Sequence, residues 1–156
     1  MASLLALFVR ACSHQAIAWI PHRLIDGYGL SEASLAAVQE HRAQVMITFD
    51  CGIADHGFAK SIEQETGCAV IITDHLLPQG SLPECTAVCN PNRPQCAYPD
   101  KHLAGVGVAW KLSPFSRSLD ERTFGVFFCS QKWTRRERCN GTGGEVAFSC
   151  EPAGSL

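Results

Sequence analysis

Residues 45–52 read VMITFDCG and residues 68–75 read CAVIITDH, two short apolar stretches that each run into an acidic residue. Both are continuously apolar and rich in β-branched residues, which is typical of parallel strands that are buried on both faces. Between them, residues 55–66 have the spacing of an amphipathic helix, and Gly67 is a suitable residue to end it. We therefore predict a β-α-β unit with two parallel strands and a right-handed crossover.

This β-α-β unit brings the polar ends of both strands to the same edge of the sheet. Asp50 follows the first strand, and Asp74 and His75 follow the second. Neighbouring strands lie about 4.8 Å apart, and open α/β sheets bind their ligands at this edge. Two carboxylates and one imidazole suit Mn²⁺ or a similar divalent ion. The residues alone therefore predict a metal site here, with the alternative that the aspartates only cap turns or helices.

Further elements extend the predicted sheet on both sides of this unit. We expect strands at residues 16–20 and 86–89, and helices at residues 3–13, 31–42 and 103–112. The predicted fold is an α/β domain with a mainly parallel sheet that is flanked by helices.

The last part of the chain has a different character. Residues 113–156 are rich in Ser, Arg, Gly and Cys and show no clear hydrophobic periodicity. Segments of this kind do not predict a packed element. We therefore expect one partial domain at residues 1–112 and a divergent, irregular and poorly ordered tail after it.

The charge and the N-terminal residues limit the classes of function. The net charge of −2 excludes nucleic-acid binding through a general excess of basic residues, so any such contact must be local. Residues 2–8 read ASLLALF, which is shorter than the roughly 20 apolar residues of a membrane span and lacks the basic start of a signal peptide. We expect a cytoplasmic protein without a membrane partner.

The nine cysteines are an odd number without any Cys-x-x-Cys pair. Reduced thiols that pack as small apolar residues in a cytosolic protein fit this pattern best. The alternative is a structural zinc site made by Cys85, Cys89, Cys96 and His102, although zinc ligands usually come in closely spaced pairs.

Six short segments occur in an order that is known from one family. They are IPHR at 20–23, GYGL at 27–30, TFDCGI at 48–53, ITDHLLP at 72–78, NPN at 90–92 and LAGVGVAWKL at 103–112. In these segments the chain resembles the RecJ-type exonucleases of the DHH phosphoesterase superfamily, which is named after its T-D-H-H signature. The resemblance runs from Ile20 to Leu112, which is 93 of the 156 residues.

This resemblance implies a partial DHH-type domain of a metal-dependent 5′-to-3′ exonuclease. The expected substrate is single-stranded DNA, and the expected cofactor is Mn²⁺ or Mg²⁺. Asp50 and His75 match ligands of the catalytic metal. Asp74 matches the DHH aspartate, which is either a further ligand or a support beside His75.

The resemblance also implies roles for residues outside the two strand ends. Arg23 matches the arginine of the IPxR segment and is expected to bind a substrate phosphate, for which a guanidinium is well shaped. The alternative for Arg23 is a solvated loop charge. Gly105 and Gly107 offer either backbone N–H groups to a phosphate or close packing of a helix.

Three features depart from the family. Leu76 stands in place of the second histidine of the signature, and a leucine cannot bind a metal. The first motif of the family, D-x-D-x-D-G, is absent, and the residues after Leu112 resemble neither its later aspartate motif nor its C-terminal DNA-gripping domain. We therefore expect a fragment of such an exonuclease that is inactive by itself.

Two alternative functions stay open at this point. One is a non-catalytic remnant that binds nucleic acid, and the other is a different DHH phosphoesterase that acts on short oligonucleotides or pyrophosphate. The strand that would carry the first motif is also missing, so we expect an exposed sheet edge that favours self-association.

Overall fold

The computed structural model describes residues 16–112 and 126–130, the second range by its backbone alone. The helix that we expect at residues 3–13 lies outside the described residues, as does the remainder of the predicted tail. Within the described part of the chain, the strands and helices predicted between residues 16 and 112 occur in the predicted order.

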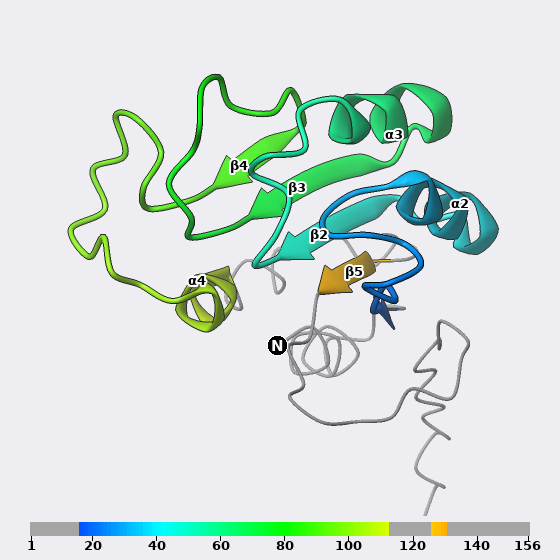
Figure 1. Ribbon diagram of the computed structural model, residues 1–156, viewed down its shortest axis with the longest axis horizontal. Coiled ribbons are helices and arrows are strands. Elements are labelled where there is room, and N and C mark those ends of the chain that lie inside the picture. The colour runs from blue at the N-terminus through cyan, green and yellow to red at the C-terminus, as the bar shows by residue number, and fades with distance from the viewer. Residues whose placement is uncertain (1–15, 113–125, 131–156) are drawn as a thin grey trace, which may run out of the picture.

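The core is one parallel sheet of five strands in the order β1-β5-β2-β3-β4 (Figure 1). The strands are β1 (Ala16–Trp19), β2 (Val45–Phe49), β3 (Ala69–Thr73), β4 (Ala87–Cys89) and β5 (Val126–Ser130). All four strand pairs are parallel. The α/β class with a mainly parallel sheet is therefore confirmed.

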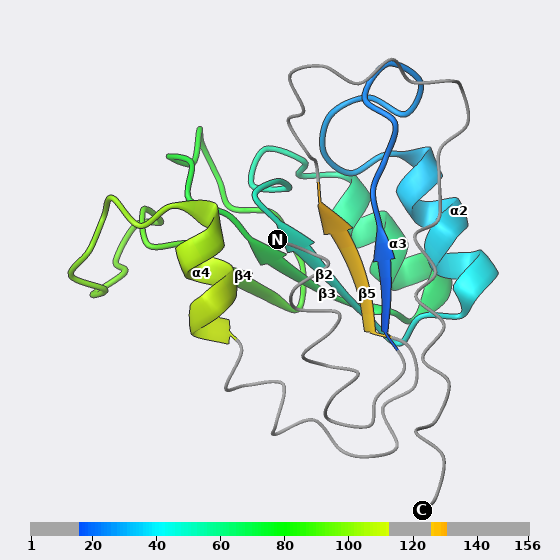
Figure 2. The same ribbon diagram turned by 90° about the horizontal axis from the view of Figure 1, so that it is seen from below.

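Three described helices cover the two faces of this sheet (Figures 1 and 2). They are α2 (Glu32–His41), α3 (Phe58–Thr66) and α4 (Gly105–Leu112). Buried residues of α2 and α3 form one core cluster with Met46 and Val70, whereas α4 packs with Ile47 on the opposite face. None of the helices in the described ranges has the length and apolar character to span a lipid bilayer.

The central β-α-β unit has the predicted geometry. Val45 pairs with Ala69 and Ile47 pairs with Ile71, so the two strands end side by side. The β2 residues 46–49 are all buried because α2, α3 and α4 together cover both faces. Gly67 ends α3 with a φ of 71°, a conformation that glycine adopts without steric cost.

The start of α3 differs from the expectation. We predicted a helix from Asp55 with that residue as its cap, but α3 begins at Phe58 with Gly57 as the N-cap residue. The Asp55 carboxylate accepts a hydrogen bond from Leu30 N–H at 2.7 Å instead. The Asp55 side chain, which the local sequence predicts as a helix cap, thus binds a backbone group 25 residues away.

Strand β5 was not predicted from the sequence. Residues 126–130 pair with β1 on one side and with β2 on the other, and Ser130 is opposite Phe49. A short strand with four apolar residues, within a polar and aperiodic region, carries little local signal. Because β5 lies between β1 and β2, the edges of the sheet in the described residues are β1 and β4.

Candidate metal centre at the carboxyl edge of the sheet

Asp50 is the first residue after β2, and its backbone is turned sharply at this point. Its φ of 61° lies in the left-handed region, which aspartate adopts more readily than most residues. Its N–H donates to the carbonyl of Thr73 at 2.9 Å, so the pairing of β2 with β3 continues to the site. The side chain is 34% exposed and can therefore reach a ligand from solvent.

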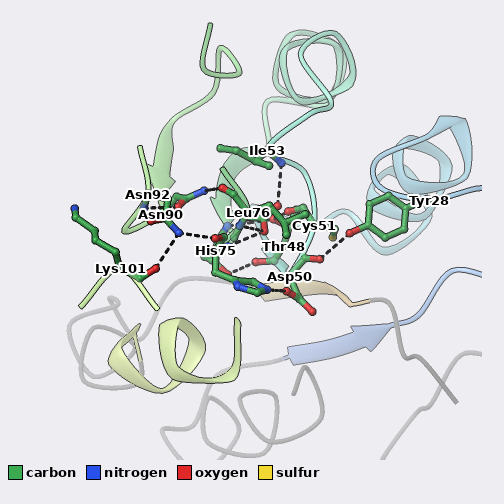
Figure 3. A network of polar contacts seen from close by, with 12 residues as sticks. Tyr28, Thr48, Asp50, Cys51, Ile53, His75, Leu76, Asn90, Asn92 and Lys101 are labelled. Carbon is green, nitrogen blue, oxygen red and sulfur yellow. Dashed lines mark hydrogen bonds and ion pairs between the residues drawn. The ribbon is translucent and has the colours of Figure 1, made fainter. Parts of the chain in front are cut away.

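His75 lies beside Asp50 because it follows the neighbouring strand. Its Nε2 is 2.8 Å from Oδ1 of Asp50 (Figure 3). This distance is within the range of a hydrogen bond or ion pair. Both atoms are of the kinds that bind divalent cations in proteins, and they are close enough to share one ion.

Asp74 is the buried member of the cluster, with 1% of its surface exposed. Its Oδ1 accepts hydrogen bonds from the N–H groups of His75 at 2.7 Å and Leu76 at 3.1 Å. Its Oδ2 accepts a hydrogen bond from Ile53 N–H at 3.3 Å. Three backbone donors thus stabilise the buried carboxylate. The two oxygens keep further lone pairs that a metal ion could use. The role of Asp74, as a ligand or as a support beside His75, stays a prediction.

The three side chains form a donor set that fits a divalent cation. One ligand atom from each of Asp50, Asp74 and His75 lies within 4.8 Å of the others. Carboxylate oxygen and imidazole nitrogen are ligands of Mn²⁺, Fe²⁺ and Zn²⁺, and the oxygens also suit Mg²⁺. The structure therefore brings together the three residues that the sequence proposes as metal ligands.

Two buried threonines join the strand ends beneath this cluster. Thr48 Oγ1 donates to the carbonyl of Cys51 at 2.8 Å and accepts from Thr73 N–H at 3.2 Å. Thr73 Oγ1 donates in turn to the carbonyl of Thr48. These bonds fix the ends of β2 and β3 relative to each other. We did not single out either threonine, although both lie one or two residues before an aspartate.

The two glycines of α4 have different surroundings. A Cβ atom on Gly105 would lie 2.6 Å from Oδ1 of Asp50, whereas a Cβ atom on Gly107 would lie 2.4 Å from Cδ1 of Leu103. Both contacts are closer than side chains allow. Gly105 thus lets α4 approach the Asp50 carboxylate, and Gly107 lets the helix pack on Leu103. Contact of either glycine with a phosphate stays a prediction.

Arg23 lies on the exposed loop that precedes α2, and Tyr28 connects it to the cluster. The guanidinium is 5.7 Å from the centre of the Tyr28 ring, which is within the range of a cation–π contact. Tyr28 Oη donates to the carbonyl of Asp50 at 3.2 Å. Partial burial raises the pKa of Tyr28, and the nearby carboxylates of Asp74 and Asp50 add to this effect. Sequence reasoning assigned no role at the site to Tyr28, although the two glycines that flank it indicate a tight turn with a close approach of the backbone.

Asp55 makes a second contact with the same loop, through a hydrogen bond to Leu30. Gly29 has a φ of 85°, and a Cβ atom at this position would lie 2.1 Å from Oδ2 of Asp55. Only glycine therefore lets the carboxylate reach Leu30 N–H. Burial raises the pKa of Asp55, and the Leu30 hydrogen bond partly opposes the shift. The loop is thus attached to the Asp50 turn at two points, through Tyr28 and through Asp55.

The proposed zinc alternative is not supported in the described residues. There, Asp50, Asp74 and His75 are the only group of three or more His, Cys, Asp or Glu side chains that could share an ion. No three of Cys85, Cys89, Cys96 and His102 lie close enough together there to share an ion. Burial raises the pKa of both Cys85 and Cys89, so these thiols are protonated at neutral pH.

The close approach of Gly105 to Asp50 yields a testable prediction. Replacing Gly105 with Ala pushes the Asp50 carboxylate away from His75, so we expect the affinity of the chain for Mn²⁺ to fall about tenfold or more, which is about 1.4 kcal/mol. Titration of Mn²⁺ followed by electron paramagnetic resonance of the free ion measures this. Gly57→Ala is the control because nothing lies within 4 Å of the added atom. Equal affinities of the two variants would contradict the prediction.

Comparison with known proteins agrees with this arrangement. Residues 1–126 match the family model described as the N-terminal domain of the DHH family. Among curated relatives, the single-stranded-DNA-specific exonuclease RecJ of Bacillus subtilis is 45% identical over 95 residues, which are 61% of this chain and 12% of the relative. RecJ of Escherichia coli is 43% identical over 93 residues, or 60% and 16%. The chain therefore spans about one eighth to one sixth of the length of these relatives.

A solved structure shares the fold. A crystal structure of exonuclease RecJ bound to manganese aligns with a TM-score of 0.53 and 24% identity, over 74% of this chain and 36% of that one. The family match covers 126 of the 156 residues and includes the whole Asp-Asp-His cluster. This chain therefore belongs to the DHH family.

Proposed function

We propose that this chain contributes part of the catalytic centre of a RecJ-like, metal-dependent 5′-to-3′ exonuclease that hydrolyses single-stranded DNA. The observation that carries this proposal is the 2.8 Å contact between His75 and Asp50 at the carboxyl edge of the sheet. The similar curated proteins are named as single-stranded-DNA-specific exonucleases, which supports the choice of substrate.

Asp50 and His75 are the proposed metal ligands, and Asp74 supports them from the buried side. We propose Mn²⁺ or Mg²⁺ as the ion, and the manganese in the related RecJ structure supports the first of these. When bound, such an ion supplies a Lewis acid that polarises the phosphoryl oxygens of the substrate. The role of this chain is to hold the two donor atoms at the carboxyl edge of the sheet and to keep the backbone of both residues in place.

The substrate contact that we propose is local. The chain has a net charge of −2, so its overall electrostatic field adds little to the binding of a long DNA strand. Arg23 presents an exposed guanidinium on the loop that Tyr28 attaches to Asp50. A planar guanidinium binds phosphate oxygens in pairs, and a terminal phosphate is the natural target for an enzyme that works from the 5′ end.

We further propose that this chain is inactive by itself. Two-metal hydrolysis of a phosphodiester needs several anionic or imidazole ligands around both ions. The described residues bring three such groups together. One of these, Asp74, already accepts hydrogen bonds from three backbone N–H groups. Leu76 leaves an apolar side chain, 46% exposed, beside His75. This set suffices for one weakly held ion.

The runner-up function is a non-catalytic remnant that binds nucleic acid. Leu76 favours it because the second imidazole of the DHH signature is absent. For either function we propose a cytoplasmic location, which suits the free thiols of the five cysteines whose side chains the structure describes. Self-association through an edge strand stays a prediction that size-exclusion chromatography with light scattering can test.

One test of this proposal concerns metal binding and activity of the purified chain. We expect it to bind Mn²⁺, and Asp50→Ala to weaken that binding more than tenfold because it removes a charged ligand. With 5′-labelled single-stranded DNA and Mn²⁺, we expect no degradation above a metal-free control. Failure to bind Mn²⁺ would contradict the metal centre. Degradation that Asp50→Ala abolishes would contradict the proposed inactivity.

A second test concerns the position after His75. Leu76→His adds an imidazole beside the site, on a backbone that Asp74 already holds, so we expect Mn²⁺ affinity to rise about tenfold, or 1.4 kcal/mol. Leu77→His is the matched control because it adds the same group one residue later, on a side chain that is 74% exposed. An equal gain in both variants would show non-specific binding by the added histidine.

A further inference from the structure

The backbone of His75 and Leu76 is held entirely by side chains. Both N–H groups donate to Oδ1 of Asp74, at 2.7 Å and 3.1 Å. The carbonyl of His75 accepts from Nδ2 of Asn92 at 2.8 Å, and the carbonyl of Leu76 accepts from Nδ2 of Asn90 at 2.8 Å. All four polar groups of this dipeptide therefore have a side-chain partner, and Figure 3 shows the two asparagines beside His75.

The two asparagines belong to one preorganised turn after β4. Asn90 is 4% exposed, and its Oδ1 accepts from the backbone N–H of Asn92 at 2.7 Å, so Asn90 holds the backbone from which the Asn92 side chain extends. The Asn92 amide also donates to the carbonyl of Lys101 at 3.1 Å. Lys101 Nζ closes the turn by donating to the carbonyls of Pro91 and Cys96, each at 2.7 Å.

We propose that Asn92, aligned by Asn90, is a positioning residue that fixes the His75 imidazole against Asp50. This inference rests on the proposed function in one respect, the assumption that His75 is a metal ligand. His75 lies just beyond the end of β3, where no strand pairing constrains its backbone. The backbone dihedrals of a residue limit the rotamers that its side chain can adopt, so the hydrogen bond from Asn92 to the His75 carbonyl restricts where Nε2 lies.

The chemistry explains why an amide suits position 92. Nδ2 carries two N–H donors and faces two carbonyl oxygens, those of His75 and Lys101. An aspartate has nearly the same shape but presents an oxygen, which repels both carbonyls. Asn92→Asp therefore replaces two hydrogen bonds with repulsion at nearly unchanged volume, and Asn92→Ala removes the hydrogen bonds without adding repulsion.

The test measures Mn²⁺ binding to the full chain, with no need for activity. We expect Asn92→Asp to weaken Mn²⁺ affinity at least tenfold and Asn92→Ala to weaken it by a smaller factor. Arg93→Ala is the matched control because its guanidinium donates to the carbonyl of Val88, on the same turn but away from His75. It should change the affinity less than twofold. Thermal unfolding in EDTA shows that each variant is folded.

A spectroscopic measurement separates positioning from a general effect on the fold. Electron spin-echo modulation detects an imidazole nitrogen bound to Mn²⁺. At saturating Mn²⁺ we expect this signal in the wild type and in Arg93→Ala, and its loss in Asn92→Asp and in His75→Ala. A folded Asn92→Asp or Asn92→Ala variant with wild-type affinity and signal would overturn the inference while the metal centre stands. Absence of the signal in the wild type would instead contradict the proposed function.

Discussion

The parallel pairing of β2 with β3 continues one residue beyond β2, through the hydrogen bond from Asp50 N–H to the carbonyl of Thr73 at 2.9 Å. This bond sets Asp50 opposite the start of the Asp74-His75 turn. The left-handed φ of Asp50 then directs its carboxylate along the sheet edge towards His75. A slip of one residue would turn the strand side chains to opposite faces and separate the donors. The buried hydroxyls of Thr48 and Thr73 resist such a slip.

Sequence reasoning could predict this part of the fold because it is encoded locally. Continuous apolar strands, a helix of the right length and polar residues at both strand ends are sufficient to place Asp50, Asp74 and His75 at one edge. The contacts that refine the site are not encoded in this way. Asp55 with Leu30, Tyr28 with Asp50, and Asn92 with His75 join residues 17 to 25 positions apart. Strand β5 was missed for the same reason, since its place between β1 and β2 depends on non-local pairing.

The site differs from a complete two-metal centre in what surrounds His75. Asp74, Asn90 and Asn92 hold the His75-Leu76 backbone rigidly, yet the side chain at position 76 is an exposed leucine. The scaffold of the DHH turn is thus present with one imidazole where the signature has two. The chain spans about an eighth to a sixth of the length of the RecJ relatives.

The claim on which this account depends is that Asp50 and His75 bind a divalent ion together. Crystals of the chain grown with Mn²⁺ test it most directly, through an anomalous difference map collected at the manganese absorption edge. We expect one strong peak between the Asp50 carboxylate and Nε2 of His75, at ligand distances of about 2.0–2.3 Å. A map with no peak there at saturating Mn²⁺, and the 2.8 Å contact between the two side chains unchanged, would contradict the account.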